Sequence, residues 1–529
     1  MDRVADSGDQ DIPLVTKPPK IPRSAYFALA VLVLTNLFNM LDRSIVAILA
    51  QSIKADLKLG DAELGFLLGT AFAVFYSVVG IAMGRISDFV SRKKMLAMGL
   101  ALWSVMTALG GAATGFMSLS AARIGVGVGE AAANPCSHSL LADTFPPRNR
   151  ALALGTYLTG TFLGTAIAMA VGGLFVQKWP DFCAAVPITG ACDVAGWRAA
   201  LVTVGVPGLL LALLVLGIKE PGRSIRPYHG SMFRMILREV AAAFPPFTLS
   251  SIHRVGGREG LMKNLQLIAI IAAIAVSLIL LTGDKAQWIA CALGAYSIFT
   301  WGQVQSYSDK PLYSVTYGDK TFALGVVATA LVAAIISAVS VWTPTLAMRT
   351  FDLPVAQLGL GLGIIFVIGS IIGVLLGGWL TDKWKVKNLS APLHITSIAL
   401  ICTIPTMALI VWASSIEVFL VAYFLKSVFT SMWGGGIAAM IQDLVLPRMR
   451  GAAAACYSLV AIVVGSGIGP YTAGKVSEIT GSLGTGIMSI LVLAPPALIL
   501  LWIAAKRLKM ETPERRLKLA TDAGEQAAA

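Results

Sequence analysis

Apolar stretches long enough to cross a bilayer, about 20 residues each, recur along the chain from Tyr26 to Ala505. Hydrophobic residues make up 56% of the 529 residues and charged residues only 13%. This composition excludes a soluble domain with a single core. Since an isolated membrane-crossing segment must satisfy its own backbone hydrogen bonds, the pattern predicts an all-α membrane protein with many crossings.

The stretches fall into two sets of six with a shorter pair between them. We expect the two sets at 25–50, 64–84, 95–114, 118–142, 151–178 and 198–218, and at 321–346, 358–380, 391–413, 418–441, 451–473 and 483–505. The shorter pair lies at 265–282 and 286–302. The basic loops of the second set lie on the same side of the membrane as the basic tails only if this insert crosses the membrane twice or not at all. We favour a transmembrane hairpin and fourteen spans; the alternative is a re-entrant or surface hairpin.

Charge indicates the domain order and the topology. The predicted parts are an N-terminal tail (1–24), a six-helix bundle (25–218), a linker with the inserted hairpin (219–320), a second bundle (321–505) and a C-terminal tail (506–529). Most of the 41 Lys and Arg residues lie in the tails and in every second loop. This distribution predicts cytoplasmic termini in an inner (plasma) membrane protein. It also argues against nucleic-acid binding as the reason for the net charge of +13. The polar segment 1–24 predicts an uncleaved first span.

The six cysteines show no metal-ligand spacing. Cys183 and Cys192 share one predicted outer loop, "DFCAAVPITGACD", and form a candidate disulfide if that side is oxidising; the alternative is two free thiols. The chain has no HExxH and no Gly-x-Ser-x-Gly motif. We therefore expect no catalytic residue, no metal and no cofactor, and interpret the chain as not an enzyme.

The chain also repeats itself. "LADTFPPRNRALALGTY" starts at Leu141, and "IQDLVLPRMRGAAAACY" starts at Ile441. A second echo links "GRISDFVSRKK" to "GGWLTDKWKVK", so that Gly84 and Asp88 correspond to Gly378 and Asp382. Echoes at matching places in two sets of six spans predict two bundles facing each other across a central site.

These motifs resemble the major facilitator superfamily and, within it, the Spinster group. The resemblance rests on "NMLDRSIVA" in the first span, the "GRISDFVSRKK" loop and "RIGVGVGEAAANPCSHSLLADTFP" in the fourth span. Phe89 and Ser91 depart from the usual loop, which has a base and a glycine there. The resemblance implies two pseudo-twofold-related six-helix bundles and a secondary transporter. It also implies lysophospholipid or sphingoid cargo and coupling to a proton gradient.

Three cations lie within predicted spans: Arg43, Arg123 and Lys426. Arg43 directly follows an acid, Asp42. Each ionised residue at a helix centre costs about 2.5–3.5 kcal/mol on insertion scales, so it normally finds a partner. At about 1.5 Å per residue, Asp42 and Arg123 lie roughly 12 and 8 Å deep. Glu130 follows Arg123 by seven residues and returns to nearly the same helix face.

Two interpretations of this cluster stay open. In the first, an ionised Asp42 holds Arg43 or Arg123, and protonation frees the arginine for Glu130 or an anionic substrate. In the second, a static ion pair orients two helices. Lys426, in the tenth core span, either faces the cavity and binds an anionic group or extends outward to the interface.

Candidate gating residues lie at predicted inner helix ends: Gly84, Asp88 and Arg92, with Asp382 in the second copy. Carboxylates there can cap a neighbouring helix, and bases can bridge to acidic loops. The alternative is that the basic residues only determine topology.

Taken together, these features predict a proton-coupled transporter of an amphipathic or anionic substrate, such as a lysophospholipid or sphingolipid, which acts as a monomer. Arg123, Glu130 and Lys426 are the candidate substrate-binding residues. Two alternatives remain: a transporter of sugar acids, other organic anions or drugs on the same fold, and a lipid-binding membrane receptor that transports nothing.

Overall fold

A computed structural model describes residues 21–87, 90–185, 194–220, 247–351, 353–446 and 449–524. Within these ranges every regular element is a helix, which confirms the predicted all-α class. Asp88 and Cys192, for which the sequence predicts roles, lie outside the described residues.

The first six predicted spans form one bundle. Its helices are α1 (Arg23–Leu57), α2 (Asp61–Gly65), the π-helical turn η1 (Phe66–Thr70), α3 (Ala71–Ile86), α4 (Arg92–Gly110), α5 (Phe116–Glu130), α6 (Ala133–Thr144), α7 (Pro147–Ala185) and α8 (Gly196–Leu216). α2, η1 and α3 are continuous and together make the second span. α5 and α6 together make the fourth.

The second bundle follows the inserted hairpin, which consists of α10 (Thr248–Thr282) and α11 (Lys285–Ser308). The short α12 (Lys310–Val315) leads into the bundle. Its helices are α13 (Lys320–Thr350), α14 (Val355–Lys385), α15 (Ala391–Val411), α16 (Ile416–Ser431), α17 (Gly434–Asp443), α18 (Arg450–Thr480), α19 (Leu483–Ser489), the 3₁₀ turn η3 (Ile490–Leu493), α20 (Ala494–Leu508) and α21 (Pro513–Asp522).

Eleven helices or continuous helix runs among the described residues are long and apolar enough to cross a membrane. The three other predicted spans correspond to α4, to α5 with α6, and to α11. All three are helical and pack among the eleven. The total of fourteen crossings stays a prediction.

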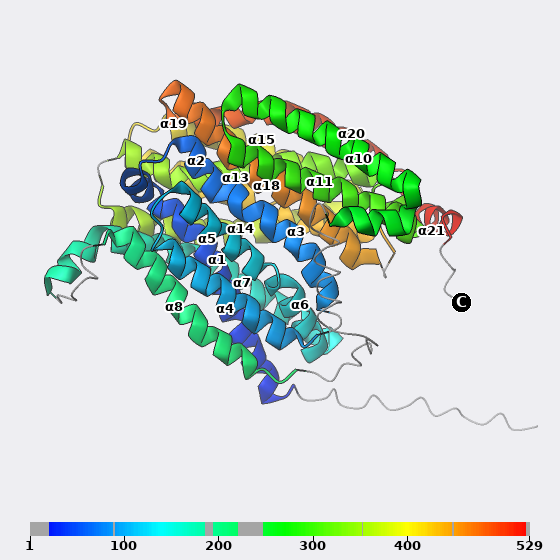
Figure 1. The fold of residues 1–529 in the computed structure, drawn as a ribbon, viewed down its shortest axis with the longest axis horizontal. Coiled ribbons are helices and arrows are strands. Elements are labelled where there is room, and N and C mark those ends of the chain that lie inside the picture. Colours follow the sequence, from blue (N-terminus) through cyan, green and yellow to red (C-terminus); the bar gives the residue numbers. More distant parts are fainter. Residues whose placement is uncertain are drawn as a thin grey trace, which may run out of the picture.

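The two bundles use the same helix pairing. In the first, α1 packs along α7 and α4 along α5; in the second, α13 packs along α18 and α15 along α16. Each pair holds the same place in its set of six spans, as expected for a structural repeat. Figure 1 shows the first bundle, in blue to blue-green, beside the second, in yellow-green to red.

The bundles touch mainly near one side of the molecule. We call the side on which α1 begins and α20 ends the terminal side, and the other the opposite side. Among the described residues, the hydrogen bonds between the bundles lie from mid-depth to the opposite side. They include the bond from the Ala356 N–H to Gln177 and the contacts of Arg349.

Glycines show where the bundles approach and where they separate. A Cβ atom on Gly69 would lie 2.1 Å from the Ser466 carbonyl oxygen, and one on Gly359 would lie 2.2 Å from that of Met169. Nearer the terminal side, the same four spans carry glycines with no described atom within 4 Å of such a Cβ, outside their own helix: Gly84, Gly155, Gly378 and Gly451. Among the described residues, the hydrogen bonds and close backbone approaches between the bundles therefore lie from mid-depth to the opposite side.

Candidate functional site

The centre of the first bundle holds a buried ion pair between α1 and α5. The Arg43 Nε donates to Glu130 Oε2 at 2.6 Å. Glu130 is fully buried, whereas the Arg43 side chain is 22% exposed. The Arg43 guanidinium also lies 4.4 Å from the ring centre of Phe72 and 4.5 Å from that of Tyr76. Aromatic faces attract a desolvated cation, so α3 helps to hold Arg43 against Glu130.

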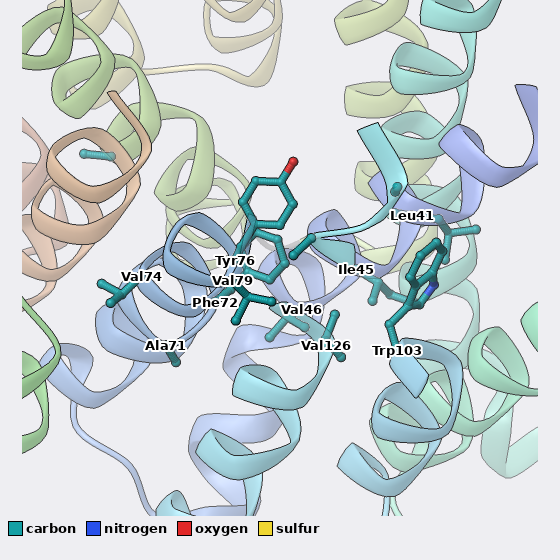
Figure 2. Packing of buried hydrophobic residues seen from close by; sticks show 14 of the residues in the cluster. Leu41, Ile45, Val46, Ala71, Phe72, Val74, Tyr76, Val79, Trp103 and Val126 are labelled. Carbon is teal, nitrogen blue, oxygen red and sulfur yellow. The ribbon is translucent and has the colours of Figure 1, made fainter. Parts of the chain in front are cut away.

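Asp42 points elsewhere. Successive helix positions are about 100° apart, so Asp42 and Arg43 contact different neighbours. The Asp42 carboxyl lies beside Trp103 and Thr107 of α4. It is buried, and its Oδ1 has no hydrogen-bond partner among the described residues. Figure 2 shows the apolar side chains of α1, α3, α4 and α5 around this region, Trp103 among them.

Arg123 contacts backbone carbonyls rather than a carboxylate. Its Nη1 donates to the Asp42 carbonyl at 3.2 Å and its Nε to the Leu67 carbonyl at 3.4 Å. Depth matching therefore placed Arg123 correctly next to Asp42. The expected ion pair between the Asp42 carboxylate and an arginine is absent among the described contacts. Arg43 is paired with Glu130 instead.

The second bundle carries one buried cation at the matching place. Lys426 of α16 is buried, and its Nζ donates to Ser340 Oγ of α13 at 3.1 Å. It also lies 5.0 Å from the Tyr423 ring centre. No carboxylate pairs with Lys426 among the residues described. The side chain therefore does not extend to an interface, which removes one of the two interpretations.

The predicted gate loop forms a network at the terminal side of the first bundle. Arg92 is almost fully buried; its Nη1 donates to Asp143 Oδ2 at 2.5 Å and its Nε to Glu220 at 3.2 Å. Ser91, which replaces the usual glycine, donates to Glu220 at 2.6 Å. Partial burial alone would raise the pKa of the Glu220 carboxyl, but the hydrogen bonds from Ser91 and Arg92 outweigh it and lower the pKa.

The second copy of the loop is simpler. Lys385 Nζ bonds Asp443 Oδ2 at 2.5 Å, so the predicted echo of Asp143 in Asp443 has a structural counterpart. Asp382 is exposed, with no hydrogen bond or ion pair to any described residue. Among the described residues, each network lies within its own bundle, and neither makes a contact that joins the two bundles. Gating roles for Gly84, Arg92 and Asp382 remain predictions.

The seal at the opposite side was missed by sequence reasoning. The Asp61 carboxylate, at the start of α2, accepts from Lys54, from Arg349 at 2.7 and 3.0 Å, and from Ser477 at 2.7 Å. Glu478 also accepts from the Ala62 N–H at 3.1 Å. Asp61 thus ties α1 and α2 to α13 and α18. An acid in the first turn of a helix is so common that position alone gave no signal.

Two further predictions concern cysteines and metals. Cys183 is disulfide-bonded, while the pairing with Cys192 stays a prediction because Cys192 is outside the described residues. Within the described ranges, no group of three or more His, Cys, Asp or Glu residues is placed to hold a metal ion.

Comparison with known proteins identifies the class. The sequence profile of the Major Facilitator Superfamily matches residues 32–343 and 325–528. The chain therefore belongs to the Major Facilitator Superfamily of membrane transporters and is not an enzyme. Within it the chain is Spinster-like: it is 29% identical to Protein spinster of Drosophila melanogaster over 203 residues, 38% of this chain and 31% of that protein.

Other relatives differ in their names. An MFS-type efflux pump of Mycolicibacterium smegmatis is 28% identical over 509 residues, 93% of this chain and 95% of the pump. A probable L-galactonate transporter of Escherichia coli is 30% identical over 212 residues, 39% of this chain and 43% of that protein. A solved bacterial homologue of the human lysosomal transporter Spinster, inward-facing and unoccupied, superposes with a TM-score of 0.65. The superposition covers 96% of this chain and 99% of the homologue at 20% sequence identity, which shows that the two share a fold.

Proposed function

We propose that this chain is a secondary active transporter that couples an amphipathic anionic substrate to protons by alternating access. The observation that carries the proposal is the buried cluster of Asp42, Arg43, Arg123 and Glu130. A carboxyl group in an apolar interior is tolerated as a neutral acid or beside a cation. Asp42 has both options, because Arg43 and Arg123 lie next to it.

The coupling step follows from the present contacts. With Asp42 protonated, Arg43 stays on Glu130. When Asp42 loses its proton, the new charge attracts Arg43 or Arg123, and Glu130 loses part of its partner. Such a change alters how α1 sits against α4 and α5. The closed side at Asp61 and the separated side at Arg92 correspond to one state of the transport cycle.

The substrate class is supported by charge. Lys426 is a buried cation without a carboxylate, and Arg43 is partly exposed, so a bound anion finds a charge in each bundle. Apolar helices around these residues favour an amphipathic substrate such as a lysophospholipid or sphingolipid. The relative named as a probable L-galactonate transporter supports a second candidate, a sugar acid.

The charge distribution supports a plasma-membrane protein with the terminal side in the cytoplasm. The structure would then be closed to the outside and open to the cytoplasm. Proton flow is the energy source in this proposal, and a single chain is the working unit, because each bundle supplies part of the site.

The test uses purified protein in liposomes that contain a pH-sensitive dye. Lysophosphatidylglycerol, galactonate and a lipophilic drug are added in turn, and substrate-driven proton movement is recorded. We expect lysophosphatidylglycerol to move protons. Asp42→Asn should abolish this movement, whereas Asp56→Asn, the same change at an acid paired with Arg198 at the opposite side, should leave it intact.

Each other result decides against part of the proposal. A response to galactonate alone selects the sugar-acid function. Thermal stabilisation by lysolipid without any flux selects a receptor. A proton response that survives in Asp42→Asn removes Asp42 from the coupling.

A further inference from the structure

The two helices of the inserted hairpin are joined by a tight turn and by buried polar contacts. Gly283 takes a left-handed conformation (φ 81°) and turns α10 back into α11. Between the two helices, the Tyr296 hydroxyl bonds Asn264 at 2.8 Å and Thr248 at 2.6 Å, and Asn264 donates to Gln303 at 2.8 Å. Buried polar pairs of this kind fix one alignment of two helices.

This unit lies across the contact between the two bundles. α11 packs on η1 and α3 of the first bundle and on α18 of the second, as Figure 1 shows for the green pair beside α3 and α18. Gly294 of α11 illustrates the closeness. A Cβ there would lie 2.6 Å from a Val463 methyl of α18 and 3.5 Å from a Val74 methyl of α3.

Three buried groups meet where the unit crosses the contact. Gln287 Nε2 donates to the Gly467 carbonyl of α18 at 2.9 Å. Thr70 Oγ1 lies 2.6 Å from Gln287 Oε1 and 2.5 Å from the Gly467 carbonyl. One residue from each of the first bundle, the hairpin and the second bundle thus shares a single polar junction.

The junction sits at irregular points of both helices. Thr70 is the last residue of the π-helical turn η1, and π-turns frequently mark functional sites. Gly467 lies three residues before Pro470, which is inside α18 and removes a helix hydrogen bond. Helices weakened at these points bend there more readily than elsewhere.

The hairpin makes more side-chain polar contacts with α18 than with the first bundle. Asp284, at the turn, accepts from the Tyr471 hydroxyl at 2.7 Å and from Lys475 at 2.8 Å. Trp288 also packs edge-on against Tyr471. On the side of the first bundle, Thr70 is the one residue that makes a side-chain hydrogen bond with the hairpin among the described contacts.

We propose that the inserted hairpin is part of the gate at the opposite side. It stays with α18 throughout the cycle and holds Thr70 while that side is closed. Opening requires Thr70 to leave both acceptors, Gln287 Oε1 and the Gly467 carbonyl, so the hydrogen bond that its hydroxyl shares between them biases the protein toward the state described here. Gln287 and Thr70 act as positioning residues, and neither touches the substrate.

Removing the junction tests this directly. Thr70→Val keeps the shape of the side chain and deletes the hydroxyl. The hydroxyl has a single proton to share between these two acceptors, so the variant loses one buried hydrogen bond, which should raise the population open at the opposite side about fivefold. The matched control is Thr472→Val on α18, because the Thr472 hydroxyl bonds only the Ile468 carbonyl of its own helix.

The readout is electron paramagnetic resonance distance measurement in liposomes, which requires no substrate. Spin labels are placed on exposed residues at the opposite side: Met117 of the first bundle, Leu281 of the hairpin and Ile479 of α18. The four free cysteines, Cys136, Cys291, Cys402 and Cys456, are replaced by alanine beforehand. Gel filtration and thermal melting check that every variant folds.

In Thr70→Val we expect a longer-distance population for Met117–Ile479 and for Met117–Leu281, and no change for Leu281–Ile479. The control should match the parent protein. If all three distances stay unchanged, the junction does not control the gate. If Leu281–Ile479 lengthens while Met117–Leu281 does not, the hairpin travels with the first bundle and the proposal is wrong. The comparison of Thr70→Val with the parent protein is made at one pH and needs neither substrate nor proton flux, so its failure is distinguishable from failure of the proposed function.

Discussion

The two bundles share one architecture but differ in the charges at their centres. In the first bundle α1 is linked to α5 by Arg43 and Glu130, with Asp42 and Arg123 beside them. In the second, the side-chain hydrogen bond described between the equivalent helices α13 and α16 is that of Lys426 with Ser340. The first centre therefore holds two carboxyl groups beside its two arginines, whereas the second holds a cation that has no counter-charge among the described residues. This difference indicates that the repeat supplies the scaffold and that each bundle has its own chemistry.

The largest expected effect comes from breaking the ion pair at the centre of the first bundle. Glu130→Gln leaves Arg43 buried without its anion and should lower the free energy of unfolding by about 3 kcal/mol. The partial exposure of Arg43 places the loss at the lower end of the range for buried pairs. Thermal unfolding followed by size-exclusion chromatography measures it. Glu259→Gln, at an exposed acid, is the control, and an unchanged midpoint in Glu130→Gln would show that the pair does not hold α1 to α5.

The next effect concerns the terminal-side network of the first bundle. Arg92→Met removes a buried cation shared by Asp143 and Glu220, and we expect a loss of about 2 kcal/mol. The loss is smaller than at Glu130 because both carboxylates are partly exposed and regain water. Lys94→Met, at an exposed position of the same helix, should have no measurable effect in the same thermal assay. Equal midpoints for the two variants would contradict a structural role for this network.

The second bundle should respond with the opposite sign. Lys426→Met replaces a buried, uncompensated charge with an apolar chain of similar length, so stability should rise by about 1 kcal/mol. Under the proposed function, affinity for an anionic substrate should fall at least tenfold at the same time. The two measurements are thermal unfolding and substrate binding by thermal shift, with Lys387→Met, an exposed position, as the control. A destabilised Lys426→Met would mean that Lys426 is compensated after all.

The sequence predicted much of this arrangement and failed at identifiable points. Span lengths, the echoes and helical phase placed Asp42, Arg43, Arg123 and Glu130 in one cluster. They did not reveal that Arg43 pairs with Glu130, because depth along a helix says nothing about its rotation toward its neighbours. That rotation turns Asp42 toward α4.

The gate residues were harder to predict for a different reason. Asp61 bonds Arg349, which lies almost 300 residues away in the sequence. Only the packing of the two bundles brings these two residues together. Gln287 likewise lies in an insert that neither repeat contains, so no echo in the sequence indicated its contacts with Thr70 and Gly467. Sequence repeats predict the features that the two bundles share. They do not predict the contacts between the bundles, which only the structure shows.

The smallest expected effect tests whether the repeated loop contributes equally to stability in both bundles. Lys385 is 29% and Asp443 51% exposed, so Lys385→Met should change stability by less than about 0.5 kcal/mol. A double-mutant cycle with Asp443→Asn measures the coupling, and the same cycle with Arg92 and Asp143 gives the comparison. We expect the coupling to be clearly larger in the first bundle, since Arg92 is buried and Lys385 is not. Equal coupling energies would mean that the burial of Arg92 does not strengthen its ion pair. The two bundles would then not differ at the terminal side as they do at their centres.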